Sequence, residues 1–196
     1  MKKKTLVLAS NNDHKILEIK EMLGKSYEIL KQSDFNIDPI PETGKSFEEN
    51  AVIKAREVHR ITGLSTIGDD SGLIVDALNG EPGIYSARYS GEKATDKENN
   101  SKLLKKLEGV SKENRTARFV CVIALIDCEE PENIYTFRGT WNGEILTKAK
   151  GSNGFGYDPL FLDPEIGKAS AELLAEDKNK LSHRAKALVS LQRHFT

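Results

Sequence analysis

Six consecutive polar residues follow a short apolar run near the start of the chain: Ser10, Asn11, Asn12, Asp13, His14 and Lys15. We expect the apolar run to form a strand and the polar residues to lead into a helix. The N-terminus of a helix presents free backbone N–H groups and a partial positive charge, which suit a phosphate, and Lys15 would add a full charge. Simple helix capping is the alternative, because the P-loop pattern G-x-x-x-x-G-K-[ST] is absent.

A second group of residues combines carboxylates with a lysine. Glu42 lies in a loop rich in Pro and Gly, and Asn50 and Lys54 are four residues apart, so they share one helix face. Asp69 and Asp70 are adjacent, and two carboxylates beside apolar segments cost desolvation energy unless a cation or hydrogen bonds compensate them. Mg²⁺ prefers one or two carboxylates together with waters and phosphates. These residues favour a divalent-cation site; a solvated helix face and a turn-forming Asp pair are the simpler alternatives.

Two further groups offer an aromatic ring and hydrogen-bond donors. The first is a glycine-rich loop, and the second is a cluster around a helix start: Phe155, Gly156, Tyr157, Asp158, then Lys178, Ser182, His183 and Arg184. An aromatic side chain on a glycine loop can stack on a base, and the donors can read carbonyl oxygens on that base. A loop aromatic that folds onto the core and an ordinary helix start are the alternatives. Together the groups predict a ligand that is anionic, aromatic and metal-binding, as a nucleoside triphosphate is.

Other chemistries lack support in the residues. The G-x-S-x-G motif of a serine hydrolase is missing, and His14, His59 and His194 show no metal-binding spacing such as H-E-x-x-H. The only cysteines, Cys121 and Cys128, form no C-x-x-C motif. We interpret both cysteines as buried strand residues, since a free cysteine packs as a small hydrophobe.

The elements that must position these residues follow from hydrophobic periodicity and capping signals. Strands are predicted over 5–10, 27–32 and 117–126, the last apolar on both faces. Helices are predicted over 14–23, 46–62, 95–107 and 183–195. Asn12 or Asp13 caps the first, Ser46 with Glu49 forms a capping box at the second, and Ser182 caps the last. The predicted inner faces are Phe47, Ala51, Ala55 and Val58 in the second helix and Leu103, Leu104 and Leu107 in the third. The alternation of strands and helices predicts an α/β fold with a mixed sheet.

Two glycine-containing segments are predicted to form turns. Residues 64–78 have apolar arms around Gly-Asp-Asp-Ser-Gly, which predicts a strand, a tight polar turn and a returning strand. Asn142-Gly143 between two apolar segments is a strong hairpin signal.

Composition limits the classes to which the chain can belong. Its 196 residues are 38% hydrophobic and 30% charged, which excludes a disordered chain and a membrane protein and predicts a single domain over residues 1–196. The net charge of −1 argues against a nucleic-acid or membrane-surface binder, so an anionic ligand needs a local site. The apolar stretch Leu6–Ala9 is too short for a signal peptide, so we expect a cytoplasmic protein.

Five segments, in one order along nearly the whole chain, form a specific set: LASNNDHKILEI, ETGKSFEENAVIKA, GDDSGLIVDALNGEPGIYSARYSG, GSNGFGYDPLF and AEDKNKLSHRAKAL. The set resembles the inosine triphosphate pyrophosphatase family, the house-cleaning XTP/dITP diphosphatases. Asn11 stands where many relatives have Gly, and no essential position is replaced. The resemblance implies a twisted central sheet flanked by helices, two lobes with an active-site cleft between them, and a homodimer.

The resemblance also implies a reaction and the roles of residues in it. The family hydrolyses the α–β phosphoanhydride of ITP, dITP or XTP with Mg²⁺, yielding a nucleoside monophosphate and pyrophosphate. Glu42 and Asp70 resemble the metal ligands, with Asp70 also the proton acceptor, directly or through metal-bound hydroxide. Lys54 resembles a phosphate contact and Ser71 a substrate contact. The remaining matches are the triphosphate loop, residues 10–15, and the nucleoside site: Phe155, Gly156, Tyr157, Asp158, Lys178, His183 and Arg184.

Base selectivity has a simple physical basis in this hypothesis. Hypoxanthine and xanthine carry a carbonyl acceptor at position 6, where adenine carries an amino donor. A buried donor without an acceptor costs about 1–3 kcal/mol, so donors from Lys178 or residues 182–184 would reject adenine. Two other functions explain part of the pattern. A nucleotide-binding sensor without turnover explains the phosphate and base groups, and a related pyrophosphatase acting on dTTP or UTP differs only in the base.

Overall fold

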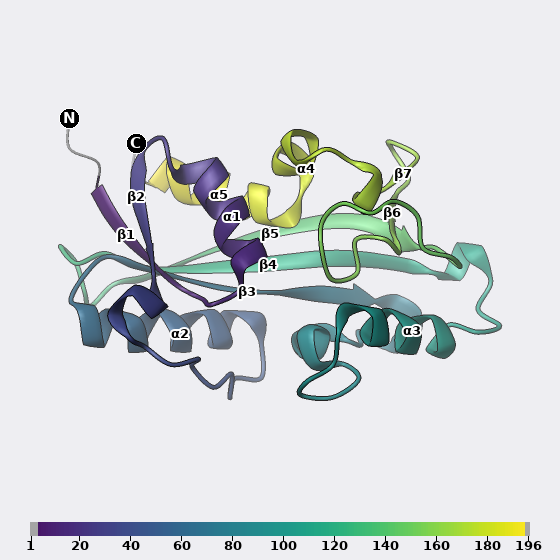
Figure 1. Cartoon of the computed structure of the whole chain (residues 1–196), viewed down its shortest axis with the longest axis horizontal. Helices are drawn as coiled ribbons and strands as arrows, with labels where there is room; N and C mark the ends of the chain where they lie inside the picture. The colour runs from purple at the N-terminus through teal and green to yellow at the C-terminus, as the bar shows by residue number, and fades with distance from the viewer. Residues whose placement is uncertain (1–3, 195–196) are drawn as a thin grey trace. The chain divides into compact units, whose positions relative to one another are not determined.

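The computed structural model describes residues 4–194, which form two compact units (Figure 1). The first unit takes in the N-terminal part of the chain through Asp70, residues 121–139, and the C-terminal part from Arg184. The second unit comprises residues 71–120 and 140–183. The expected single domain over residues 1–196, with a cleft between lobes, stays a prediction.

Seven strands form one mixed sheet, in the order β2-β1-β3-β4-β5-β6-β7. β1 pairs in parallel with β2 and β3, whereas β6 pairs antiparallel with β5 and β7. The strands β1 to β7 span Lys4–Ala9, Tyr27–Lys31, Thr66–Val75, Thr116–Ile126, Ile134–Ile145, Phe161–Asp163 and Lys168–Ala169. The helices α1 to α5 span Asp13–Leu23, Phe47–Thr62, Asp96–Lys106, Ala175–Leu181 and His183–His194. This arrangement confirms the predicted α/β fold with a mixed sheet flanked by helices.

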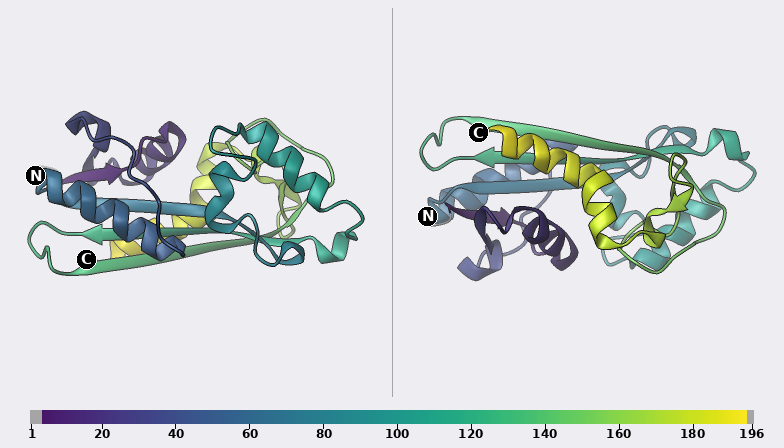
Figure 2. Two further views of the ribbon diagram at one scale, coloured as in Figure 1. Left: turned by 90° about the horizontal axis from the view of Figure 1, so that it is seen from below. Right: turned by 90° about the horizontal axis from the view of Figure 1, so that it is seen from above.

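The core of the first unit follows from the alternation of side chains along β1. Leu6 and Leu8 pack with apolar residues of α1 and α5, whereas Val7 and Ala9 pack with Val58 of α2. Successive strand residues point to opposite faces of a sheet, so the two sets of helices cover opposite faces. Figure 2 shows α2 in the view from below and α5 in the view from above. The predicted inner face of α2 is confirmed: Phe47, Ala51, Ala55 and Val58 are all buried.

The second unit has a core of its own, rich in aromatic side chains. Phe119 of β4 contacts Phe161 of β6 and Trp141 of β5, with ring centroids 4.5 and 6.4 Å apart. Leu103 of α3 and Leu107, which follows this helix, pack into the same cluster. The helix predicted over 95–107 is thus confirmed as α3, and two of its three predicted inward leucines are fully buried.

The turn predicted within residues 64–78 is wrong, because β3 runs unbroken through the Gly-Asp-Asp-Ser-Gly segment. The strand contains a glycine at position 68 because α2 packs tightly against it there: a Cβ added to Gly68 would lie 2.1 Å from the carbonyl oxygen of Ala51. A glycine inside a strand often marks such a close backbone approach. Asp69 and Asp70 are therefore neighbours in a strand rather than at the tip of a turn.

The hairpin predicted at Asn142-Gly143 is also wrong, because a strand again runs unbroken through the segment. β5 continues through both residues, and β6 pairs with the strand directly after them, with Ile145 opposite Phe161. A Cβ on Gly143 would lie 2.4 Å from the carbonyl oxygen of Leu162 and 2.5 Å from the Phe161 ring. The glycine makes room for a neighbouring strand instead of reversing the chain.

Several local predictions concern the ends of helices. Asn12 caps α1, and the hydroxyl of Ser46 accepts the N–H of Glu49, as predicted. The Glu49 carboxylate accepts from the N–H of Lys45 rather than completing a capping box with Ser46. Cap formation by Ser182 stays a prediction, and residue 195 of the last predicted helix lies outside the described residues.

The two cysteines differ in environment. Cys121 is buried in β4, as predicted. The prediction for Cys128 is wrong, since it is exposed in the turn beyond the end of that strand. Among residues 4–194, no helix is long and apolar enough to cross a membrane.

Candidate active site

The polar segment between β1 and α1 forms a compact helix start. The Ser10 hydroxyl accepts the N–H of Asn12, and the Asn12 side chain accepts the N–H of Lys15. Asn11, Asp13 and His14 are exposed. Capping, the simpler reading of this segment, is therefore present in the structure, and phosphate binding by residues 10–15 stays a prediction.

Two predicted metal ligands meet on one lysine in the first unit. The Lys54 Nζ lies 2.6 Å from Oε1 of Glu42 and 3.1 Å from Oδ1 of Asp70. The Asn50 amide donates to the second Asp70 oxygen at 3.2 Å, and its own oxygen accepts the N–H of Gly44. Residues of a loop, a helix and a strand thus converge at one place, as the sequence predicts for Glu42, Lys54 and Asp70.

The electrostatics of this acidic pair suit the binding of a cation. Burial raises the pKa of the Asp70 carboxyl and outweighs Lys54 and Lys15, which lower it, while nearby Glu42 raises it further. Burial alone would lower the pKa of Lys54, but Asp70 and Glu42 outweigh that effect and raise it. The structure therefore brings two carboxylates to one ammonium, a set of oxygen donors that a cation can bind.

The donor chemistry of the acidic pair fits Mg²⁺. This ion is bound in proteins by one or two carboxylates and completes its shell with waters and substrate phosphates. Within residues 4–194, no group of three or more His, Cys, Asp or Glu side chains is arranged to hold a metal ion. A cation bound by Glu42 and Asp70 would therefore depend on oxygen atoms from water and substrate.

Asp69 has entirely different neighbours from those of Asp70. Its side chain is fully buried and accepts from Lys15 Nζ at 2.6 Å and from Arg184 Nε at 2.8 Å. The thiol of Cys121 donates to the same carboxylate at 3.3 Å, and Arg184 also contacts Glu18. Burial would raise the pKa of Asp69, but Arg184 and Lys15 outweigh it and hold this pKa well below its usual range. The consecutive strand residues Asp69 and Asp70 thus form ion pairs with different cations.

In the second unit, Asp158 organises the glycine-rich loop. Its carboxylate accepts from the N–H of Phe155 at 2.9 Å, the hydroxyl of Ser170 at 2.8 Å and Nζ of Lys178 at 2.5 Å. Asp158 is 2% exposed. The tight loop also requires Gly154, whose φ is +75° and whose added Cβ would lie 2.0 Å from an Asp158 oxygen. Four predicted nucleoside-site residues are brought together here: Phe155, Gly156, Asp158 and Lys178.

The loop presents its aromatic ring beside a cation. Lys178 Nζ lies 4.9 Å from the centre of the half-buried Phe155 ring. The backbone of the next residue is held by α3: Gly156 N–H donates to Asp96, and the Gly156 carbonyl accepts from Asn100. These contacts restrict the direction in which the Phe155 ring can point.

The other predicted nucleoside-site residues lie deeper. Tyr157 is buried in the core of the second unit, and its hydroxyl donates to the carbonyl of Ser86. His183 is also buried and stacks on Phe119 with ring centroids 4.8 Å apart. Ser71 is half-buried at the strand position after Asp70. The substrate contacts predicted for these three residues stay predictions.

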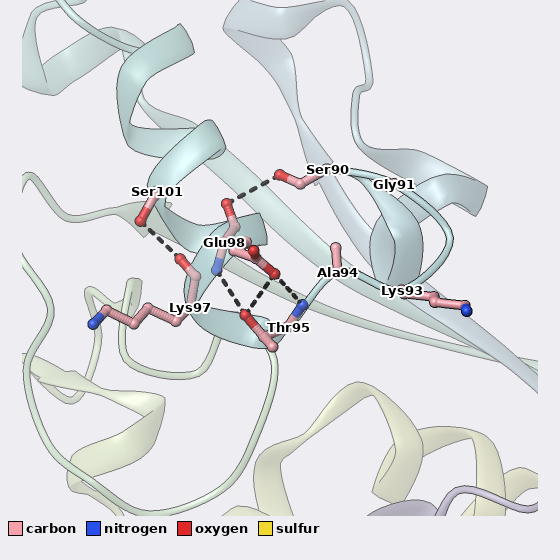
Figure 3. A pocket seen from close by; sticks show the side chains of 8 residues that line it. All are labelled: Ser90, Gly91, Lys93, Ala94, Thr95, Lys97, Glu98 and Ser101. Atoms are coloured by element: carbon pink, nitrogen blue, oxygen red, sulfur yellow. Dashed lines mark hydrogen bonds between the residues drawn. The ribbon is translucent and has the colours of Figure 1, made fainter.

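A hollow of about 800 Å³ in the second unit contains none of the predicted site residues. Figure 3 shows its lining around the first turn of α3, where the Thr95 hydroxyl accepts the N–H of Glu98 and the Glu98 carboxylate accepts the N–H of Thr95. This capping box already satisfies groups that an anion would otherwise meet at a helix N-terminus. The hollow therefore does not compete with the charged groups as the candidate site.

Comparison with known proteins identifies the family. The sequence profile of the Ham1 family matches residues 6–194. The chain belongs to the Ham1 family. It is 53% identical to a dITP/XTP pyrophosphatase of Vibrio parahaemolyticus, over 96% of this chain and 94% of that one. It is 51% identical to a dITP/XTP pyrophosphatase of Geobacter sulfurreducens, over 97% and 96% of the two chains.

Solved Ham1 structures share the fold over almost the full chain. A HAM1 protein from Coxiella burnetii superposes with a TM-score of 0.89 at 43% identity, covering 98% of both chains. The Ham1 protein of Staphylococcus aureus superposes with a TM-score of 0.87, also at 43% identity and 98% coverage of both. Membership of the Ham1 family confirms the resemblance seen in the sequence motifs.

The structure shows which residues orient the site. Asn50, which the sequence groups with Lys54 without a role of its own, links Asp70 to the loop of Glu42. Asp96 and Asn100 hold Gly156, but they lie far from it in the sequence, and nothing in the local pattern indicates the contact. For this member of the Ham1 family, the sequence names the charged side chains and misses those that orient them.

Proposed function

We propose that this protein is a nucleoside triphosphate pyrophosphatase. It hydrolyses the α–β phosphoanhydride of deaminated purine nucleotides (ITP, dITP and XTP) and removes them from the nucleotide pool. Water is consumed, and the products are a nucleoside monophosphate and pyrophosphate. The observation that carries the proposal is the convergence of Glu42 and Asp70 on the ammonium of Lys54.

The names of the relatives support this substrate class. Proteins about half identical to this chain over nearly their full length are dITP/XTP pyrophosphatases. The acidic pair matches the requirement of phosphoanhydride hydrolysis, in which charge on the phosphates must be neutralised and the attacking water positioned. A plain nucleotide sensor would gain little from such a pair, so hydrolysis is favoured over binding without turnover.

In the proposed mechanism, Glu42 and Asp70 would hold Mg²⁺, and the ion would neutralise charge on the phosphates. Asp70 accepts the proton of the attacking water. Lys54 stays charged beside both carboxylates and stabilises charge that builds up on the phosphates. The segment Ser10–Lys15 binds the remaining phosphates with its backbone N–H groups.

The base is recognised by the other predicted residues. The Phe155 ring stacks on the purine, and Lys178, His183 and Arg184 supply donors to its carbonyl oxygens. Asp158 holds the ammonium group of Lys178 beside the ring. Adenine, with a donor at position 6, leaves such buried donors without an acceptor, and each unmatched contact costs about 1–3 kcal/mol.

A substrate panel tests the proposal. The purified protein is incubated with Mg²⁺ and ITP, XTP, dITP, ATP, GTP or dTTP, and both pyrophosphate and the monophosphate are identified. We expect release of pyrophosphate from ITP, dITP and XTP, and loss of activity on chelation of the metal. Binding of ITP without product would support the sensor function instead, and a preference for dTTP or UTP would support the related pyrophosphatase.

The proposal extends to the setting of the enzyme. We infer a homodimer by analogy with the relatives, with a small-molecule substrate and with neither nucleic acid nor membrane as a partner. We also infer a cytoplasmic location, in keeping with two free cysteines, one of them exposed. Sedimentation of the purified protein tests the oligomeric state.

A further inference from the structure

Asp69 gathers two cations from separate helices of the first unit. Lys15 lies in the first turn of α1, and Arg184 is the second residue of α5. Both meet Asp69, with Arg184 Nη2 adding a contact at 3.3 Å to the oxygen that also binds Lys15. A single strand residue therefore connects the starts of two helices.

Helix stability does not account for this arrangement. Cations near a helix N-terminus are unfavourable because the helix dipole is positive there. Buried ion networks are also weak contributors to stability, since desolvation offsets much of their attraction, and apolar residues of similar volume often replace them without loss. Arg184 is 1% exposed and Asp69 also 1%, so the cost of desolvation is large. A functional reason for keeping the two cations here is the better explanation.

The charges also separate Asp69 from the cation site. Lys15 and Arg184 form ion pairs with Asp69 and Glu18, whereas Glu42 and Asp70 both form ion pairs with Lys54. Both oxygens of Asp69 accept hydrogen bonds from cations, and one also accepts from Cys121. Asp69 therefore has no surplus charge to offer a metal ion, although it is adjacent to Asp70.

We propose that Asp69 is a positioning residue that orients Lys15 toward the phosphates of the nucleotide and Arg184 toward its nucleoside. It acts through these two cations and touches neither substrate nor metal. The inference rests on the proposed function and extends it. One carboxylate, that of Asp69, would set the distance between the phosphate contact Lys15 and the nucleoside contact Arg184. Cys121, which donates to the same carboxylate, supports its orientation.

The test uses two partial ligands whose binding is measured by calorimetry in the presence of Mg²⁺. Pyrophosphate reports on the Lys15 contact, and inosine monophosphate reports on the Arg184 contact. We expect Lys15→Met to weaken pyrophosphate alone, and Asp69→Asn to weaken both ligands by about tenfold or more, as expected when one partner of a buried charge pair is removed. The Mg²⁺ concentration for half-maximal ITP hydrolysis should change less than about threefold in Asp69→Asn, since Glu42 and Asp70 are intact.

Two further variants keep the test decisive if Asp69→Asn does not fold. The double variant Lys15→Met/Asp69→Asn removes one charge of each sign and leaves Arg184 beside Glu18. It should bind pyrophosphate as Lys15→Met does, because Asp69 acts on phosphate only through Lys15, and it should bind inosine monophosphate about tenfold more weakly. Cys121→Ala, which removes only the weak thiol donor, should change either affinity by less than about threefold.

Unchanged or tighter binding of both partial ligands in the Asp69 variants would overturn the positioning role. An additive loss of pyrophosphate affinity in the double variant would do the same, because it would mean that Asp69 acts on phosphate independently of Lys15. Failure of the wild-type protein to hydrolyse ITP would instead overturn the proposed function. The two failures are distinguishable, since the binding measurements do not depend on turnover.

Discussion

Two buried carboxylates, Asp70 in the first unit and Asp158 in the second, each lie beside a buried lysine, yet their surroundings differ. Asp158 is completed by Lys178, a serine hydroxyl and a backbone N–H. Asp70 shares Lys54 with a second carboxylate. The first arrangement pairs one carboxylate with one lysine and fixes a loop, whereas the second brings two carboxylates to one lysine. Burial beside a lysine therefore does not by itself indicate a catalytic carboxylate; the balance of charge around it does.

The strongest way to break this comparison is to replace Asp70 by Asn. We expect pyrophosphate release from ITP to fall by about 10³-fold or more while the protein stays folded, because a cation ligand and the proton acceptor are both lost. Rates and circular dichroism are measured together. Asp76→Asn, at an exposed carboxylate paired with Arg118, is the control and should retain full activity. An undiminished rate in Asp70→Asn would remove Asp70 from its role.

Asp158→Asn should act mainly on stability. Lys178 would remain buried without its anion, and removal of one partner of a buried pair costs about 3–5 kcal/mol. The free energy of unfolding is measured by urea denaturation. Lys178→Met/Asp158→Asn, which removes both charges, should recover part of the loss. Equal stability of Asp158→Asn and the wild type would show that the carboxylate is not the centre of the loop.

Glu42→Gln should weaken the affinity for Mg²⁺ without preventing saturation. We expect the Mg²⁺ concentration for half-maximal rate to rise by about 10- to 100-fold, because the excess negative charge beside Asp70 disappears. Glu48→Gln, at an exposed residue paired with Arg138, provides the matched control. If Glu42→Gln needed no more Mg²⁺ than the control, the acidic pair would not be the cation site.

Phe155→Ala should give the smallest of these effects. Loss of stacking on the base raises the KM for ITP by about tenfold. Binding of pyrophosphate, which has no base, should stay unchanged and serves as the internal control. An unchanged KM would mean that the Phe155 ring packs elsewhere when substrate binds.

The residues that sequence analysis placed correctly are those governed by local rules. The cap at Asn12 and the inner face of α2 depend on neighbours within one or two turns of a helix. The two wrong turns, at Gly68 and Gly143, came from interpreting glycine locally. In both cases the absent side chain makes room for a segment distant in the sequence.

The candidate site divides in the same way. Residue types and family motifs indicated Glu42, Lys54 and Asp70, because the chemistry of a phosphoanhydride needs such groups. The sequence could not assign different partners to Asp69 and Asp70. The partners of Asp69 come from α1 and α5, whereas Lys54, the partner of Asp70, comes from α2. The two sets are separated because successive strand residues point to opposite faces of the sheet, and different helices cover those faces.

The absence of a side chain at Gly68 has a consequence for the reaction. Ala51 and Ala55, whose backbones touch it, belong to the same helix as Asn50 and Lys54, and Asp70 lies two residues further along the strand. The distance between the helix and the strand at this contact therefore determines how far the Lys54 ammonium lies from the Asp70 carboxylate. One methyl group at this position would push the helix outward and separate the reacting charges, although it carries no chemistry of its own.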